Sequence, residues 1–163
     1  MIFKTFSTNW DDKYEFSNDI IFKYEYEGID DVPYLSEAFS VGIGAGTNYL
    51  ILAIDECSDI IMGAIVLHVG ETETYNGTGA KSWISSVGVH PDYQGKGIAR
   101  FLIHEFFQFA EENNIGKVEQ SSYTEDGLLK IKHLFEEIKD DYPTVEYLDV
   151  LNIDVNNYCD SIE

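Results

Sequence analysis

Residues 83–102 read WISSVGVHPDYQGKGIARFL, a β-rich run that passes through a glycine-containing loop directly into an amphipathic helix. Gly95 and Gly97 have no Cβ, so the backbone around them can approach a phosphate closely and adopt dihedral angles that other residues avoid. The helix that follows begins with N–H groups that have no intrahelical partner, and its dipole favours an anion. The sequence therefore predicts a pyrophosphate-binding loop, and an ordinary glycine-containing turn is the alternative.

Two other phosphate-binding patterns fit the chain less well. The segment Gly42-Ile-Gly-Ala-Gly46 is similar to part of a dinucleotide fingerprint, but it precedes an apolar run instead of following a strand, and its third glycine comes one residue early. We interpret it as a flexible turn. The run Gly95-Lys96-Gly97 has no Ser or Thr after the lysine and no glycine five residues before it, which excludes a Walker loop.

The loop and its flanks resemble the GNAT superfamily of N-acetyltransferases. The superfamily signature Q/R-x-x-G-x-G/A is met by Gln94, Gly97 and Ala99, and a strand ending in valine and then a proline precede it. The resemblance implies an α/β (α+β) fold, with a mixed central sheet of about six or seven strands that is splayed between the fourth and fifth strands and flanked by helices. It covers most of residues 20–153, and we expect residues 1–163 to form a single acyl-CoA N-acyltransferase domain.

The pattern of residues predicts the same order of elements. Strands are expected at 20–26, 49–55, 60–69, 82–89, 117–124 and 145–150, and helices at 34–39, after the loop, and at 126–140. The apolar residues of the helix after the loop recur at helical spacing: Ile98, Phe101, Leu102, Phe106 and Phe109. The first twenty residues lie outside the resemblance, and an extra strand and a cap over the sheet both remain open for them.

Charge is the second strong signal, because 30 acidic and 10 basic residues give a formal net charge of −20. Nucleic acid is therefore a poor partner. The sole arginine, Arg100, follows Lys96 by four residues at the predicted phosphate site, so the local charge there is reversed. Elsewhere the carboxylates should attract polycations such as polyamines, aminoglycosides or basic protein segments. The alternative is that the acidic surplus only maintains solubility or reflects a salty environment.

Composition also limits the location and the chemistry of the protein. The sequence has no run of 18 apolar residues and its first residues carry no signal-peptide pattern, so we expect a cytoplasmic protein that does not bind a membrane. Cys57 and Cys159 lack metal-ligand spacing and are expected to be free thiols, and no metal cofactor is expected. A homodimer and a monomer both remain open.

The resemblance implies that acetyl-CoA is the co-substrate and assigns residues to it. Its pantetheine would pair with the edge of the strand at Val87, Gly88 and Val89, and Gly88 would suit the bulge that starts the splay. The remaining residues assigned to the cofactor lie in the loop and the first helical turn, where main-chain amides would hold the pyrophosphate: Gln94, Gly95, Lys96, Gly97, Ile98, Ala99 and Arg100.

The implied reaction is direct transfer of an acetyl group from the thioester to an amine. The amine must first lose its proton, because an alkylammonium with a pKa near 10 is only about one part in a thousand free base at neutral pH. The oxyanion that forms must be stabilised, which a backbone N–H near Val89 could do.

The sequence departs from the superfamily at two positions that carry chemistry. Trp83 stands where many members have a glutamate base, and Phe135 stands where many have a tyrosine that protonates the leaving thiolate. Trp83 would either hold a cationic amine by cation–π attraction or pack in the core. The candidate substitutes for the acid and base are Tyr123, Glu119, His133 and Glu73, each of which could also be a packing or surface residue.

Two functions of different classes remain. The first is N-acetyl transfer from acetyl-CoA to a primary amine of a cationic acceptor, with a polyamine, an aminoglycoside-like compound and a protein lysine or N-terminus all open. The second is a catalytically reduced protein of the same fold that uses its acidic surface to bind a basic protein partner. The intact loop favours the first function, and the missing acid and base favour the second.

Overall fold

The structure is a computed structural model that describes residues 1–9, 46–58, 60–74, 77–120 and 125–149. Its centre is one mixed sheet of six strands in the order of the chain. The strands are β1 (Ile2–Asn9), β2 (Gly46–Asp55), β3 (Ile60–Gly70), β4 (Ser82–Val89), β5 (Lys117–Gln120) and β6 (Glu146–Asp149). Strands β1 to β4 pair antiparallel, whereas β5 pairs parallel with β4 and β6 parallel with β5.

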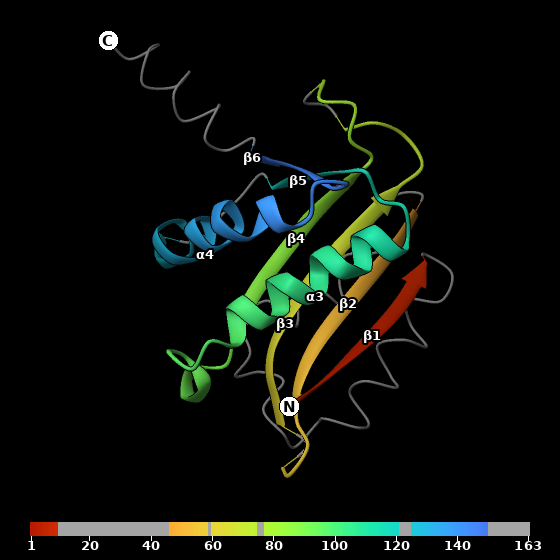
Figure 1. Cartoon of the computed structure of the whole chain (residues 1–163). Helices are drawn as coiled ribbons and strands as arrows, with labels where there is room; N and C mark the ends of the chain where they lie inside the picture. The colour runs from red at the N-terminus through yellow and green to blue at the C-terminus, as the bar shows by residue number, and fades with distance from the viewer. Residues whose placement is uncertain (10–45, 59, 75–76, 121–124, 150–163) are drawn as a thin grey trace.

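Two helices make the crossovers that parallel strands require. Helix α3 (Ile98–Glu112) connects β4 to β5, and α4 (Glu125–Ile138) connects β5 to β6, with a 3-10 turn at Lys139–Asp141 before the last strand. Both helices lie on the same face of the sheet (Figure 1). This mixed α/β architecture confirms the predicted fold class.

The sequence located the described elements closely. Strand β4 has the predicted bounds, and β2 and β3 form the predicted hairpin. Residues 2–9, which the sequence left open, form an edge strand paired with β2. The predicted strand at 20–26 and helix at 34–39 lie outside the described residues, as do residues 121–124 of the predicted strand at 117–124. Within the described part of the chain, no helix is both long and apolar enough to cross a bilayer.

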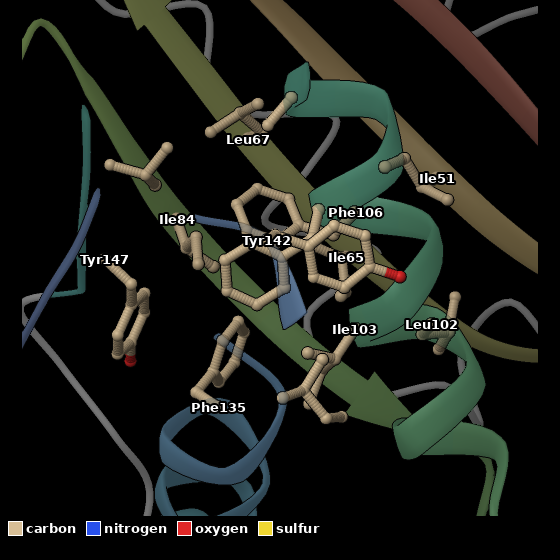
Figure 2. Packing of buried hydrophobic residues seen from close by; sticks show 14 of the residues in the cluster. Ile51, Ile65, Leu67, Ile84, Leu102, Ile103, Phe106, Phe135, Tyr142 and Tyr147 are labelled. Atoms are coloured by element: carbon tan, nitrogen blue, oxygen red, sulfur yellow. The ribbon is translucent and has the colours of Figure 1, made fainter. Parts of the chain in front are cut away.

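The core lies between the sheet and the two helices (Figure 2). Strands β2 and β3 contribute Ile51, Ile65 and Leu67 to it, and α3 contributes a stripe of fully or largely buried side chains: Ile98, Leu102, Ile103, Phe106, Phe107 and Ala110. The alternate residues Leu50, Leu52, Ile54 and Val66 are also buried, at 0–2% exposure. Both faces of β2 and β3 are therefore apolar, which explains their continuous hydrophobic sequences.

An aromatic stack joins α3, α4 and β6. The rings of Phe135 and Tyr147 lie parallel with centroids 4.7 Å apart, and those of Phe107 and Tyr142 lie parallel with centroids 5.2 Å apart. Phe135 is 0% exposed, so it is a core residue that holds α4 against the sheet. Figure 2 shows its ring between α4 and the side chains of Ile103 and Phe106.

Phe101 does not belong to this core, although the sequence pattern placed it on the buried face of its helix. Its side chain is 50% exposed. The buried stripe is set by Leu102 and Phe106 together with Ile103 and Phe107, and at 3.6 residues per turn Phe101 then falls on the opposite side of α3. The spacing of apolar residues in the sequence allowed Phe101 to lie on the buried face of the helix. Packing against the sheet instead buries the side of α3 that carries Leu102 and Phe106.

Phe135→Ala should lower the free energy of unfolding by about 3–5 kcal/mol, because it removes a fully buried ring and leaves a cavity in the aromatic stack. Phe101→Ala on the exposed side of α3 is the control and should change it by no more than about 0.5 kcal/mol. Urea denaturation followed by circular dichroism measures both values. Equal effects of the two substitutions would contradict the assignment of the core.

Candidate functional site

The loop after β4 has the backbone that a close anion contact requires. It begins with a 3-10 turn, Pro91–Tyr93, whose first residue is preceded by His90, and the Nδ1 atom of His90 accepts the N–H of Asp92 at 3.1 Å. Gly95 and Gly97 both have positive φ angles, 78° and 82°, which other residues adopt only with strain. The glycines in this loop are therefore required by the backbone, independently of any ligand.

The first turn of α3 presents unpaired N–H groups. Gly97 is the N-cap and provides no side chain to satisfy them. Its carbonyl accepts the N–H of Phe101 at 3.2 Å, so the amides of residues 97–100 have no intrahelical acceptor. Among the described residues, a Cβ at Gly95 would meet nothing within 4 Å, and one at Gly97 would meet Phe101 alone, at 3.8 Å. Open space in front of unpaired amides fits an anion such as a phosphate.

Side-chain contacts hold this loop to the sheet. The amide of Gln94 donates to the carbonyl of Val89 at 3.3 Å and ties the loop to the end of β4. The Lys96 ammonium lies 5.2 Å from the centroid of the Tyr93 ring, and the Tyr93 hydroxyl donates to Asp55, the last residue of β2, at 3.4 Å. These contacts tie the loop to the ends of β4 and β2 and hold the Lys96 ammonium over Tyr93.

Arg100 has a carboxylate partner. Its guanidinium donates two hydrogen bonds of 3.1 Å to the two oxygens of Glu137 near the end of α4. The pair raises the pKa of Arg100 and lowers the pKa of Glu137 from their ordinary values. Both side chains are nearly half exposed, so the pair contributes little to stability, but Glu137 competes with any anion for the arginine.

Among the described residues, the stretch of β4 that the sequence assigned to pantetheine has a partner strand on one edge only. Val87, Gly88 and Val89 pair with β3 on one side, and the N–H of His90 donates to Met62 on β3 at 2.8 Å. Because successive residues of a strand direct their N–H groups to opposite edges, the N–H of Val89 points away from β3. Within the described residues, β5 pairs with β4 only at residues 82–84, and Figure 1 shows β5 and β6 pointing away from the line of β4.

The bulge in β4 is not at Gly88, where the sequence prediction placed it. Gly88 has a regular partner in Ala64, and the register with β3 shifts between Val66 and Leu67, which leaves Ser85 as the extra residue. The reason is that a bulge is fixed by the register of two strands, whereas a glycine only permits one. The bulge therefore begins one residue after the described β4–β5 pairing ends.

A row of polar and aromatic side chains crosses the face of the sheet opposite α3. The His68 ring stacks on Trp83 with centroids 4.0 Å apart, and its Nδ1 lies 2.7 Å from Oδ1 of Asn48. Burial lowers the pKa of His68, so its ring is neutral at neutral pH. Trp83 is only partly buried, which leaves part of its surface accessible beside β5.

Glu119 lies next to Trp83 in the parallel register of β4 and β5. It is 1% exposed, although sequence reasoning had weighed it as a charge at a strand edge. Its Oε1 accepts the hydroxyl of Thr74 at 2.6 Å and the hydroxyl of Thr78, both from the β3–β4 connection. Sequence reasoning missed these two threonines, because 41 and 45 residues separate them from Glu119.

Comparison with known proteins identifies the family. The family model described as acetyltransferase (GNAT) family matches residues 8–138, which is most of the chain. The chain belongs to the GNAT acetyltransferase family. No curated protein matches it.

Solved structures share the GNAT fold with this chain. A tetramutant of the BH1408 protein from Bacillus halodurans has a TM-score of 0.51 at 17% identity, with 85% of this chain and 92% of that chain covered. Tetrahymena GCN5 has a TM-score of 0.54 at 12% identity, with 82% and 78% covered. At these identities the likeness concerns the fold alone.

The remaining candidates for acid and base in this GNAT domain are spread apart. His133 is exposed on α4, one turn before Glu137, whose pKa it helps to lower. Glu73 is exposed in the β3–β4 connection, and Tyr123 lies outside the described residues. The structure thus brings Glu119 beside Trp83, whereas His133 lies with the Arg100–Glu137 pair on the exposed side of α4.

The buried His68 should make stability depend on pH. Because its pKa is lower when folded than the ordinary 6.5, the unfolded chain takes up the proton first, and stability falls as the pH drops through 6.5. His68→Phe keeps a ring on Trp83 and removes this contribution, so the loss of unfolding free energy between pH 7.5 and 5.5 should be smaller by up to about 1.4 kcal/mol per pH unit.

Urea denaturation at both pH values gives the slope of unfolding free energy against pH for the parent protein and for His68→Phe. His133→Gln at an exposed position is the control and should leave the slope as in the parent protein. If His68→Phe also left it unchanged, the imidazole would not be a buried neutral group.

Proposed function

We propose that this chain is a single-domain, acetyl-CoA-dependent N-acetyltransferase that acts on a primary amine of a cationic acceptor. The observation that carries the proposal is the set of unpaired amides at residues 97–100, behind two glycines of positive φ, at the end of β4 in a GNAT chain. The acidic surface, with a net charge of −20, supports a polyamine, an aminoglycoside-like compound or a basic protein segment as the acceptor.

The amides of residues 95–100 would hold the pyrophosphate, and Val87 to Val89 would pair with the pantetheine. Acetyl-CoA would supply the activated carbonyl. A helix N-terminus contributes only about 0.3–1 kcal/mol per favourable charge at a surface. Charge-assisted hydrogen bonds of about 1.5–3 kcal/mol each are therefore needed to offset the repulsive global charge, and Lys96 is the nearest donor not held by a carboxylate.

Gly97→Val should abolish measurable CoA binding without unfolding the protein. The new side chain would crowd the loop where the phosphate is proposed to bind, and its Cβ meets no core atom, because Phe101 alone among the described residues lies within 4 Å of it. Isothermal titration calorimetry with CoA measures the affinity, and a thermal melt checks the fold.

Gly77→Val is the matched control, since Gly77 also has a positive φ, 70°, and among the described residues a Cβ there meets nothing within 4 Å. It should bind CoA as the parent protein does. Normal binding by Gly97→Val would refute the proposed position of the pyrophosphate.

For the chemical step we propose Glu119 as the base and the Val89 N–H as a donor to the oxyanion. The support for Glu119 is its position beside Trp83, where many GNAT members have a glutamate, so the carboxylate would lie one strand over. Because Glu119 is buried, it would take the proton through a water or a threonine hydroxyl, and the Trp83 ring would border the amine. Tyr123 stays a predicted acid for the thiolate, and His133 is less suited because it is exposed on α4.

Glu119→Gln should lower kcat about 100-fold or more and leave the affinity for CoA unchanged. The amide keeps the size of the side chain and an oxygen for the threonine hydroxyls, but it cannot take up a proton from the amine. A free-thiol assay with acetyl-CoA and spermidine measures turnover. Glu73→Gln, at an exposed acid of the same connection, is the control, and undiminished turnover of Glu119→Gln would exclude it as the base.

A second function, binding of a basic protein by a catalytically reduced GNAT domain, is favoured by one observation. Phe135 is fully buried in the aromatic stack, so the position of the usual tyrosine offers no acid. The same thiol assay separates the two functions. Binding of acetyl-CoA without thiol release for polyamines, aminoglycosides or basic peptides would support the second.

A further inference from the structure

Phe101 is a large apolar side chain exposed beside the phosphate loop. Among the residues that the structure describes, only Met1 and Phe101 are large hydrophobics with an exposed surface, at 46% and 50%. A single exposed apolar residue needs no explanation by itself, so its position has to carry the argument. The Phe101 ring reaches to 3.8 Å from the point where a Cβ would stand on Gly97, so it borders the space in front of the loop amides.

The surroundings of this ring favour an anionic ligand with a planar group. The unpaired amides of residues 97–100 lie on the same helical turn, and Lys96 precedes them with its ammonium over Tyr93. Arg100, the neighbour of Phe101, adds a second cation, although Glu137 is paired with it. A chain with a net charge of −20 thus has two of its ten cations within five residues of Phe101 in the sequence, one over Tyr93 and one paired with Glu137.

We propose that Phe101 is the stacking platform for the adenine base of CoA. The inference rests on the proposed function, because it needs the pyrophosphate at the amides of residues 97–100. In a nucleotide held there by its phosphates one ribose separates the base from the phosphates, and a ring beside the loop can cover one face of that base. Stacking of a base on an aromatic side chain is sequence-tolerant, depends on the ring and weakens strongly when the ring is lost.

The platform also assigns a role to the outward position of Phe101. On the buried side of α3 the Phe101 ring would add to the core. On the exposed side half of its apolar surface stays in contact with water, which is unfavourable. Covering the ring with adenine removes this apolar surface from water. The same residue would then distinguish CoA from shorter pantetheine thioesters that carry no base.

The test compares CoA with 4′-phosphopantetheine, which lacks the 3′-phosphoadenosine and one of the two phosphates of the pyrophosphate, in calorimetric titrations of four proteins: the parent, Phe101→Trp, Phe101→Leu and Phe101→Ala. Phe101→Leu is the matched control, because it keeps an apolar side chain and loses the aromatic face. We expect Leu and Ala to weaken CoA binding about fivefold to tenfold and Trp to retain or improve it. Binding of 4′-phosphopantetheine should be the same for all four proteins.

Three results would overturn the proposal. CoA affinity of Phe101→Ala equal to that of the parent would show that the base lies elsewhere. Equal weakening of both ligands would show that the ring only shapes the loop. A change of oligomeric state in sedimentation, without a change in CoA affinity, would show that the ring contacts a second copy of the chain.

The proposed function fails in a distinguishable way. If the parent protein itself gives no heat with CoA, the phosphate site is wrong and the platform falls with it. If the parent binds CoA and the aromatic and aliphatic variants do not differ, only the platform is wrong.

Discussion

Burial of one side of α3 is the constraint on which the rest of the site depends. Six side chains of this helix pack on β2, β3 and the aromatic stack, and none of them can leave without exposing the core. With the helix fixed in this way, its first turn must lie just beyond the end of β4, and its unpaired amides must face outward. The hydrophobic effect thus positions polar groups that it does not itself stabilise. The proposed anion site therefore depends on the packing of apolar residues along the whole helix.

The charge distribution of the molecule has two opposite effects on the proposed CoA-dependent reaction. An acidic surface attracts cationic acceptors and repels the phosphates of the cofactor. The groups that would attract the phosphates lie close to the proposed site, where salt screens their charges least. They are the amides of α3, Lys96 over Tyr93, and Arg100. Glu137 weakens this attraction by pairing with Arg100. The helix amides would therefore contribute more to phosphate binding than the number of cations in the loop suggests.

Sequence predicted those features that depend on neighbours along the chain. The bounds of β4, the loop and the start of α3 follow from alternation, glycine and helical spacing within twenty residues. Features that depend on distant partners were missed. The bulge at Ser85 is set by the register with β3, the outward side of Phe101 by the sheet beneath α3, and the burial of Glu119 by hydroxyls from the β3–β4 connection. The partner of Arg100 lies 37 residues away and leaves no local sign.

The hydrogen bond between His68 and Asn48 has a consequence for how the strands find their alignment. In the native pairing the two residues lie opposite each other on β3 and β2, on the face away from α3. A shift of one residue would turn the imidazole or the amide toward Leu102 and Phe106, where no polar group could receive it. Without this contact, two strands that are almost entirely hydrophobic could pair equally well in several registers. This one polar contact therefore favours a single pairing register of the β2–β3 hairpin.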